Sequence, residues 1–179
     1  MAKRKPRFRD IPKFTRSGSY EVDVSLAYLP QHMKTYVEEY GLDMNPDFQR
    51  GHVWSEEQQI RFIEFILRGG TSARLIYFNC PHWHNGGRED FVLVDGKQRL
   101  EACRRFMENK IPAFGYLYKD YSDKPDMLDA RLRFNVNDLK TRAQVLQWYI
   151  DLNAGGVVHT TEEIEKVRRL LEEEKHEHS

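Results

Sequence analysis

The segment whose residue types are best suited to chemistry is Val94-Asp95-Gly96-Lys97-Gln98-Arg99. An apolar run that predicts a buried strand precedes it, and a helical pattern of apolar residues follows it. Gly96 permits a tight turn and the close approach of a ligand to the backbone. Free amide groups at a helix start attract anions, and Lys97 and Arg99 add two cations there, while Gln98 adds an amide. The segment therefore predicts an anion site, and we expect the anion to be the phosphate of a nucleotide.

A purely structural role for this segment is the alternative. Asp95 could be a plain N-cap, with Lys97 and Arg99 merely exposed on the helix surface. Cations at a helix start oppose the helix dipole by about 0.3–1 kcal/mol each at an exposed site. A structural helix start would rather carry acids, so the charges favour the anion site.

A second segment combines the polar pair Gln49-Arg50 with apolar neighbours. The pair follows the turn signal Asn45-Pro46, and Phe48, Val53 and Trp54 are expected to anchor the loop in the core. Rigid apolar anchors around a Gln-Arg pair suit a binding site. The alternative is an arginine held in the loop by a salt bridge.

These two segments, in this order, resemble the N-terminal domain family of the GmrSD-type restriction endonucleases. The pattern is Pro46-x-Phe48-Gln49-Arg50-x-x-Val53-Trp54, an amphipathic helix, and then Val94-Asp95-Gly96-x-Gln98-Arg99-Leu100. The resemblance covers about residues 20–170, where Asn153-x-Gly155-Gly156 and the following Glu162-Glu163 are similar to a later segment of the family. This family belongs to the wider ParB/sulfiredoxin-like fold.

The resemblance implies an α+β domain of ParB/sulfiredoxin-like type, with a small mixed sheet packed by helices and a nucleotide pocket. In the family, an Asp-Gly-Gln-Gln-Arg motif binds nucleoside triphosphates and helps to hydrolyse them. Lys97 replaces one of the glutamines, and a lysine can still hold a phosphate as a point charge. Nuclease members commonly carry a further C-terminal domain, often of His-Asn-His type. No such constellation is found in this sequence, which puts nuclease activity of this chain alone in doubt, although the activity is possible.

The expected roles divide into catalysis and binding. The candidate catalytic residues are Asp95, Gln98, Arg99 and Gln49. The candidate phosphate or nucleotide ligands are Gly96, Lys97, Arg99, Arg50 and Asn153. A magnesium ion travels with a triphosphate, and Asp95 is the expected ligand for it. Either glutamine would orient the attacking water, in a chemistry that depends mainly on positioning and charge.

Other clusters carry weaker signals. Cys80, His82 and His84 have a spacing that could suit zinc, but no second cluster supplies the remaining ligands, so we expect no metal there. His52 and His159 each fall near a candidate site segment, the one after Gln49-Arg50 and the other after Asn153, and permit acid–base chemistry, although lone histidines are more often structural.

The rival hypothesis is a DNA-binding or protein-binding module, a phage or defence-system component that acts with a separate nuclease. The basic residues 1–18, the Arg104-Arg105 pair and Trp83, which could stack on a base or pack on a neighbour, favour it. Equal numbers of basic and acidic residues, 28 of each, oppose tight non-specific DNA binding. A nickase with unrecognised catalytic residues is a third possibility.

The elements that must position these residues mix strands and helices irregularly, which predicts an α+β fold. Strands are expected at 20–24, 74–79, 91–94, 111–118 and 132–136; helices are expected at 29–40, from a Ser55 capping box to 69, after Gly96, after Thr141, and after Thr160 or Thr161. We expect one domain, residues 19–172, between a flexible basic tail, 1–18, and a polar tail, 173–179.

Composition sets the outer limits. With 179 residues, of which 40% are hydrophobic, the chain can build one core. Its two cysteines, Cys80 and Cys103, form no disulfide framework, and no apolar run approaches the roughly 18–20 residues of a membrane span. We therefore expect a soluble, cytoplasmic protein.

Overall fold

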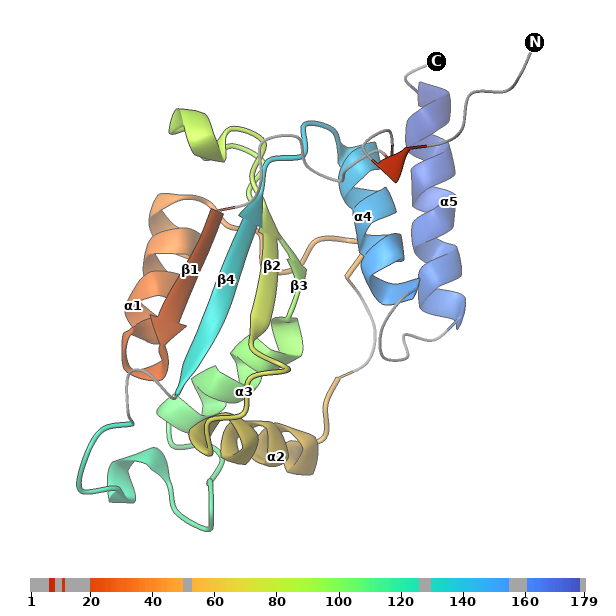
Figure 1. Cartoon of the computed structure of the whole chain (residues 1–179). Helices are drawn as coiled ribbons and strands as arrows, with labels where there is room; N and C mark the ends of the chain where they lie inside the picture. The colour runs from red at the N-terminus through yellow and green to blue at the C-terminus, as the bar shows by residue number, and fades with distance from the viewer. Residues whose placement is uncertain are drawn as a thin grey trace.

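A four-stranded mixed sheet forms the centre of the molecule, in the order β1-β4-β2-β3 (Figure 1). The computed structural model describes residues 7, 8, 11, 20–49, 53–125, 130–154 and 161–177. The strands are β1 (Tyr20–Ser25), β2 (Leu75–Asn79), β3 (Val92–Asp95) and β4 (Arg131–Asn137). β4 is antiparallel to β1 and parallel to β2, and β2 is antiparallel to β3. The expected α+β fold with a mixed sheet is confirmed.

One face of this sheet is apolar because apolar residues alternate along its strands. Val22 and Val24 of β1 lie opposite Phe134 and Leu132 of β4, and Ile76 of β2 pairs with Phe134 on the other side. All five side chains belong to one hydrophobic cluster. This face therefore carries the main core.

Three helices contribute to the core on the apolar face: α1 (Leu29–Lys34), α2 (Glu56–Leu67) and α3 (Lys97–Met107). In Figure 1, α1 and α3 lie behind the strands and α2 lies below their lower ends. The helix expected at 29–40 is α1 followed by a π-helical turn, Thr35–Glu39. The capping box expected at Ser55 is confirmed, since its side chain accepts from the Gln58 amide and Gln58 bonds back to the Ser55 backbone.

A second, smaller core lies at the β3 edge, where α4 (Arg142–Ala154) and α5 (Thr161–Glu177) pack as a pair (Figure 1). It includes Val94 and Phe48 from the central part of the chain, and Trp148 and Val167 from the helix pair. Val92 and Val94 face this core because side chains alternate along β3, and the bulge between Tyr77 and Phe78 places Asp95 opposite Tyr77. Thr141 caps α4 as expected, accepting from the Gln144 amide at 3.3 Å, and α5 continues beyond the boundary expected at residue 172.

The strand expected at 111–118 is wrong. The segment folds back on itself, since Ala113 and Tyr116 exchange two backbone hydrogen bonds around Phe114 and Gly115, whose φ angles are 50° and 82°. Ile111 and Ala113 are buried against the main core, so their apolar character reflects loop packing. Among the described helices, none combines the length and apolarity that crossing a membrane requires.

Candidate functional site

The junction between β3 and α3 has the tight backbone that the sequence predicted. Gly96 is the N-cap of α3 with φ 107°, and a Cβ there would lie 2.6 Å from Ile76 Cδ1. Only glycine fits this conformation and this contact. Gly96 has no side chain that could cap the helix, and the first turn of α3 contains no acidic residue. Among the described residues, the first amide groups of α3 therefore lack a side-chain acceptor while Lys97 and Arg99 add positive charge.

Asp95 and Arg99 form an ion pair on one side of this junction. Arg99 Nη2 lies 2.6 Å from Asp95 Oδ2, and Arg99 Nη1 donates to the carbonyl of Leu75 in β2. The Asp95 side chain is 29% exposed and the Arg99 side chain is 19% exposed. The structural alternative, with Asp95 as the N-cap and Arg99 exposed, is wrong because Gly96 is the N-cap and Arg99 ties α3 to the neighbouring strand.

Lys97 and Gln98 lie on the other side of the junction. Lys97 Nζ donates to Asn45 Oδ1 at 2.6 Å, and Gln98 Oε1 accepts from the Trp54 amide at 3.0 Å. Both residues line a cavity of about 770 Å³ between α1 and α3, which Asp95 and Arg99 do not line. The motif is thus divided between two faces of the molecule.

Gln49 joins the first segment to the second, as the resemblance implies. Its Nε2 donates to the Val94 carbonyl at 2.5 Å, directly before Asp95. Its Oε1 is buried and has no hydrogen-bond partner among the described residues. Phe48 beside it is buried and packs edge-on against Tyr149 of α4, with ring centroids 5.3 Å apart. The anchor expected at Phe48 is confirmed.

The other two expected anchors differ from each other. Trp54 packs edge-on against Phe62 with a centroid distance of 5.4 Å and is partly buried in the main core. Val53 is 73% exposed and lies at the cavity beside Lys97, so the expectation that it anchors the loop is wrong. Arg50 and His52 lie outside the described residues.

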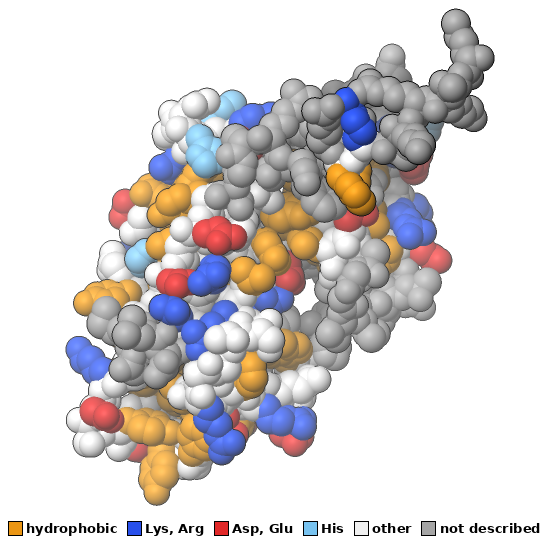
Figure 2. Space-filling model, in the orientation of Figure 1, with side chains coloured by type: hydrophobic (Ala, Val, Ile, Leu, Met, Phe, Trp, Pro, Cys, Tyr) orange, Lys and Arg blue, Asp and Glu red, His pale blue; other side chains and the backbone are white. Residues whose placement is uncertain are grey.

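A polar row crosses the sheet on the face opposite the main core. Glu21, Asn135, Tyr77 and Asp95 are register partners from strand to strand. Asn135 Nδ2 donates to Glu21 Oε1 at 2.9 Å. Burial, and then the negative charge of Asp95, raise the pKa of the Tyr77 phenol. Acidic and basic side chains gather on this face in Figure 2.

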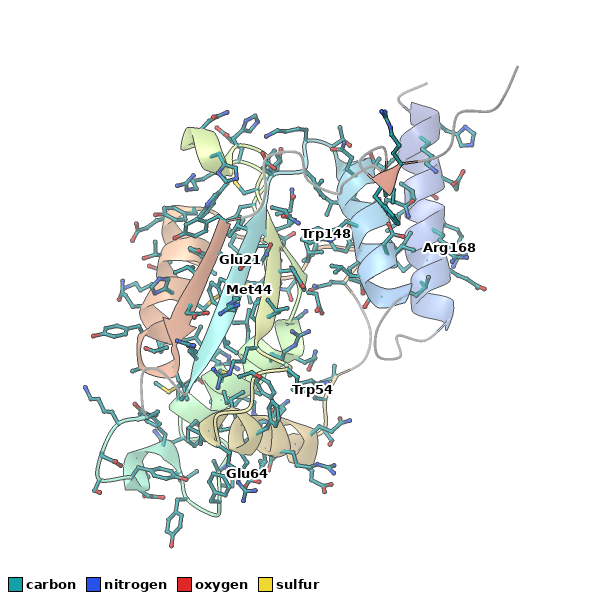
Figure 3. All side chains as sticks on the ribbon, viewed as in Figure 1. Glu21, Met44, Trp54, Glu64, Trp148 and Arg168 are labelled. Carbon is teal, nitrogen blue, oxygen red and sulfur yellow. The ribbon has the colours of Figure 1, made fainter. Side chains whose placement is uncertain are left out.

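The row brings Tyr77, Asn135 and Glu21 next to Asp95, and sequence reasoning missed all three. The signal for Glu21 and Asn135 was the polar half of the alternation in β1 and β4, Tyr-Glu-Val-Asp-Val and Arg-Leu-Arg-Phe-Asn-Val-Asn. Figure 3 shows Glu21 on β1 and Trp148 on α4, whose ring lies 5.5 Å from that of Tyr77. The α4–α5 pair thus borders one end of the polar row.

The next row on this face is an ion-pair cluster. Asp23 Oδ1 lies 2.9 Å from Arg133 Nε, and Asp23 Oδ2 lies 3.4 Å from Arg131 Nε. The hydrogen bond from Arg133 lowers the pKa of the Asp23 carboxyl. The polar face therefore carries charges of both signs that are already paired.

Asn153, an expected ligand, lies in the last turn of α4. Its Nδ2 donates to the Tyr149 carbonyl one turn earlier at 2.7 Å. His159 and the Gly155-Gly156 pair lie outside the described residues.

The β2–β3 loop is a packed structure. Trp83 contacts Tyr36 and Phe91, and the Arg88 guanidinium lies 4.2 Å from its ring centre, so Trp83 packs on neighbours in this structure. Cys80 is buried, and burial raises the pKa of its thiol, whereas His82 and His84 are exposed. In the part of the chain that the structure describes, no group of three or more His, Cys, Asp or Glu side chains could hold a metal.

The arginine pair named for DNA contact is occupied within the protein. Arg104 lies 2.7 Å from both Glu101 and Glu108. Arg105 Nη2 lies 2.8 Å from Glu56 Oε2, which ties α3 to α2. The Arg104 guanidinium therefore forms ion pairs along the surface of α3, and the Arg105 guanidinium links α3 to α2.

Comparison with known proteins gives one match. The model of the family described as GmrSD restriction endonuclease, N-terminal domain, matches residues 33–132. No curated protein and no solved structure matches the chain. The matched range begins in the last turn of α1 and contains the whole of α2, β2, β3 and α3, and therefore both segments of the expected site.

Proposed function

The chain belongs to the family of the GmrSD restriction endonuclease N-terminal domain, and from this premise we propose that it binds a nucleoside triphosphate at the β3–α3 junction. The family relates the chain to restriction and defence. Nucleotide binding would then be its contribution to such a system, either as a switch or through slow hydrolysis.

The observation that carries this proposal is the uncapped start of α3. Gly96 gives the tight turn that starts the helix against Ile76, and the first turn contains two cations and no acid. An isolated helix start with this charge is unfavourable, because the dipole and the cations have the same sign. A bound phosphate reverses the sign of that interaction and supplies acceptors for the amide groups.

Each motif residue has a role that fits its contacts. The Lys97 ammonium has three donor hydrogens and uses one on Asn45, so it can also hold a phosphate oxygen. The Gln98 side-chain oxygen accepts from the Trp54 amide, which holds the side chain in place. The NH₂ group of Gln98 could then donate to a ligand. Arg99 keeps further donors beyond those used on Asp95 and Leu75, and it also fixes the helix to β2.

A magnesium ion would enter as part of the nucleotide complex, since Mg²⁺ is usually held by one or two carboxylates together with phosphate oxygens and water. Asp95, whose Oδ2 is paired with Arg99, is the carboxylate at the junction that would hold the ion. When bound, the ion would neutralise phosphate charge. Of the two glutamines, Gln98 has a donor group that could bind a phosphate oxygen, whereas the donor group of Gln49 is bound to the Val94 carbonyl. These contacts support phosphate binding more directly than they support the positioning of a water.

The test is calorimetric titration of ATP, GTP, CTP and UTP with magnesium, with phosphate release followed in the same samples. Saturable binding is expected, and Lys97→Ala should weaken it about tenfold or more because one phosphate contact of about 1.5–3 kcal/mol is lost. Lys34→Ala is the matched control: it removes an exposed lysine of α1 that is paired with Glu38, and the variant should bind as the parent does. Failure of all four nucleotides to bind would refute the proposal, and phosphate release would separate an enzyme from a switch.

A second role, in DNA contact together with a separate nuclease, is favoured by the family's description as a restriction endonuclease domain. The basic residues 1–18 are the segment available for it, since Arg104 and Arg105 are paired within the protein. A gel shift that weakens with salt and disappears on deletion of residues 1–16 is the expected result. Absence of a shift at low salt would exclude this role.

A further inference from the structure

The cavity of about 770 Å³ between α1 and α3 has a composition that the nucleotide phosphates leave unexplained. On α3 its lining follows the helical spacing from Lys97 and Gln98 through Leu100 to Met107. It thus runs along the helix from the proposed phosphate site toward the last turn of α3. Its volume lies within the range of roughly 300–1,000 Å³ that is typical of small-molecule sites.

The walls of this cavity are apolar and adaptable. Met33, Met44 and Met107 line it, and these are three of the five methionines in the chain. Leu100, almost fully buried, also lines it, and Val37 of the π-helical turn is 44% exposed there. Methionine side chains fill irregular gaps and make favourable sulfur contacts with aromatic rings. The surface therefore suits a planar ring.

Charge divides the cavity into two parts. At its α3 start, Lys97 and Gln98 offer an ammonium and an amide NH₂ group, which attract phosphate oxygens. Farther along α3, Arg104 is neutralised by Glu101 and Glu108, each at 2.7 Å. An occupant with an anionic end and an uncharged flat end matches this order.

We infer that this cavity receives the base and sugar of the nucleotide whose phosphates bind at the α3 start. This inference rests on the proposed function and adds the place and the chemistry of base recognition. The polar groups that could read the edge of a base, Glu101, Arg104 and Glu108, are engaged with one another. Affinity therefore follows the ring area buried against methionine and leucine, and purine nucleotides bind more tightly than pyrimidine nucleotides.

The experiment compares ATP with inorganic triphosphate, both with magnesium, by calorimetry on the full chain. The parent protein should bind ATP about tenfold or more tightly than triphosphate, because adenosine adds apolar contact. Val37→Trp fills the cavity from an exposed position and should lower ATP affinity to the level of triphosphate, with triphosphate affinity unchanged. Met107→Trp, from the opposite wall, should do the same, and it keeps the test independent of one variant's folding. Phe65→Trp, which does not line the cavity, is the control and should bind as the parent does.

The possible outcomes are distinct for the two proposals. If both filling variants bind ATP as the parent does, or if ATP binds no better than triphosphate, this inference is refuted and the phosphate site stands. If neither ATP nor triphosphate binds to the parent, the proposed function fails and the inference fails with it. A CTP affinity above that of ATP would refute recognition by ring area.

Discussion

The two faces of the central sheet are built by the same strands and do different work. The covered face carries Val22, Phe134 and Ile76 in adjacent strands and packs against three helices. The polar face carries Glu21, Asn135 and Tyr77, each next in sequence to one of these apolar residues, and Asp95 of β3. Stability should therefore reside mainly in the first face, whereas the second can accept polar groups that a core would exclude.

The largest expected effect tests this division with neighbouring residues of β4. Phe134→Ala removes a fully buried ring and should lower the free energy of unfolding by about 3–5 kcal/mol. Asn135→Ala, one residue later on the other face, removes the bond to Glu21 and should cost about 1 kcal/mol. Urea denaturation measures both. Equal losses would show that the polar face is as important to stability as the core.

The next effect concerns Gly96, which joins β3 to α3, one of the helices on the apolar face of the sheet. Gly96→Ala should lower the free energy of unfolding by about 2–4 kcal/mol, because the new Cβ meets Ile76 and φ 107° is strained for alanine. Gly115→Ala is the matched control: it also has a positive φ, but nothing lies within 4 Å of its added Cβ, so only strain should appear. A smaller loss for Gly96→Ala than for Gly115→Ala would contradict the close packing.

A smaller effect is expected at the polar face itself. Arg99→Ala leaves the half-buried Asp95 carboxylate and the Leu75 carbonyl without a donor, and should cost about 1–3 kcal/mol of unfolding free energy. Arg61→Ala, whose exposed partner is Glu57, should cost under about 1 kcal/mol. Thermal unfolding of the two variants measures the difference. Equal melting temperatures would show that the Asp95–Arg99 pair contributes no more to stability than the exposed Arg61–Glu57 pair.

The smallest effect depends on pH. The pKa of Asp23 is lowered in the folded protein, so its ion pairs stabilise the fold above the unfolded value of 3.8, and this contribution disappears as pH falls through the folded value. Asp23→Asn should therefore cost about 0.5 kcal/mol at neutral pH and nothing at the acidic end of that range. Denaturation at a series of pH values measures the gap, and a gap that widens on acidification would contradict the pairing with Arg133.

The elements that the sequence predicted are those with local signals. The alternation in β1, the Ser55–Gln58 capping box and the apolar stripe of α3 depend on residues a few positions apart. Cys103 lies on that stripe and is completely buried, which raises the pKa of its thiol to about 12. Such features are dictated by backbone periodicity.

What the sequence could not predict depends on pairing at long range. The division of the motif, with Arg99 toward Leu75 and Lys97 toward Asn45, requires the positions of β2 and of the preceding loop. The bulge that places Asp95 opposite Tyr77 depends on the β2–β3 register. The apolar residues of 111–118 resembled a strand because buried loop residues and buried strand residues have the same composition.

The strand order also determines when the protein can fold during synthesis. β4, Arg131–Asn137, lies between β1 and β2 and is the last of the four strands to be made. Until it emerges, β1 lacks the strand with which it pairs, and the apolar residues of both neighbours stay exposed. The nascent chain therefore carries unpaired edges of the kind that favour aggregation, and the sheet closes in one late step rather than by successive addition of strands.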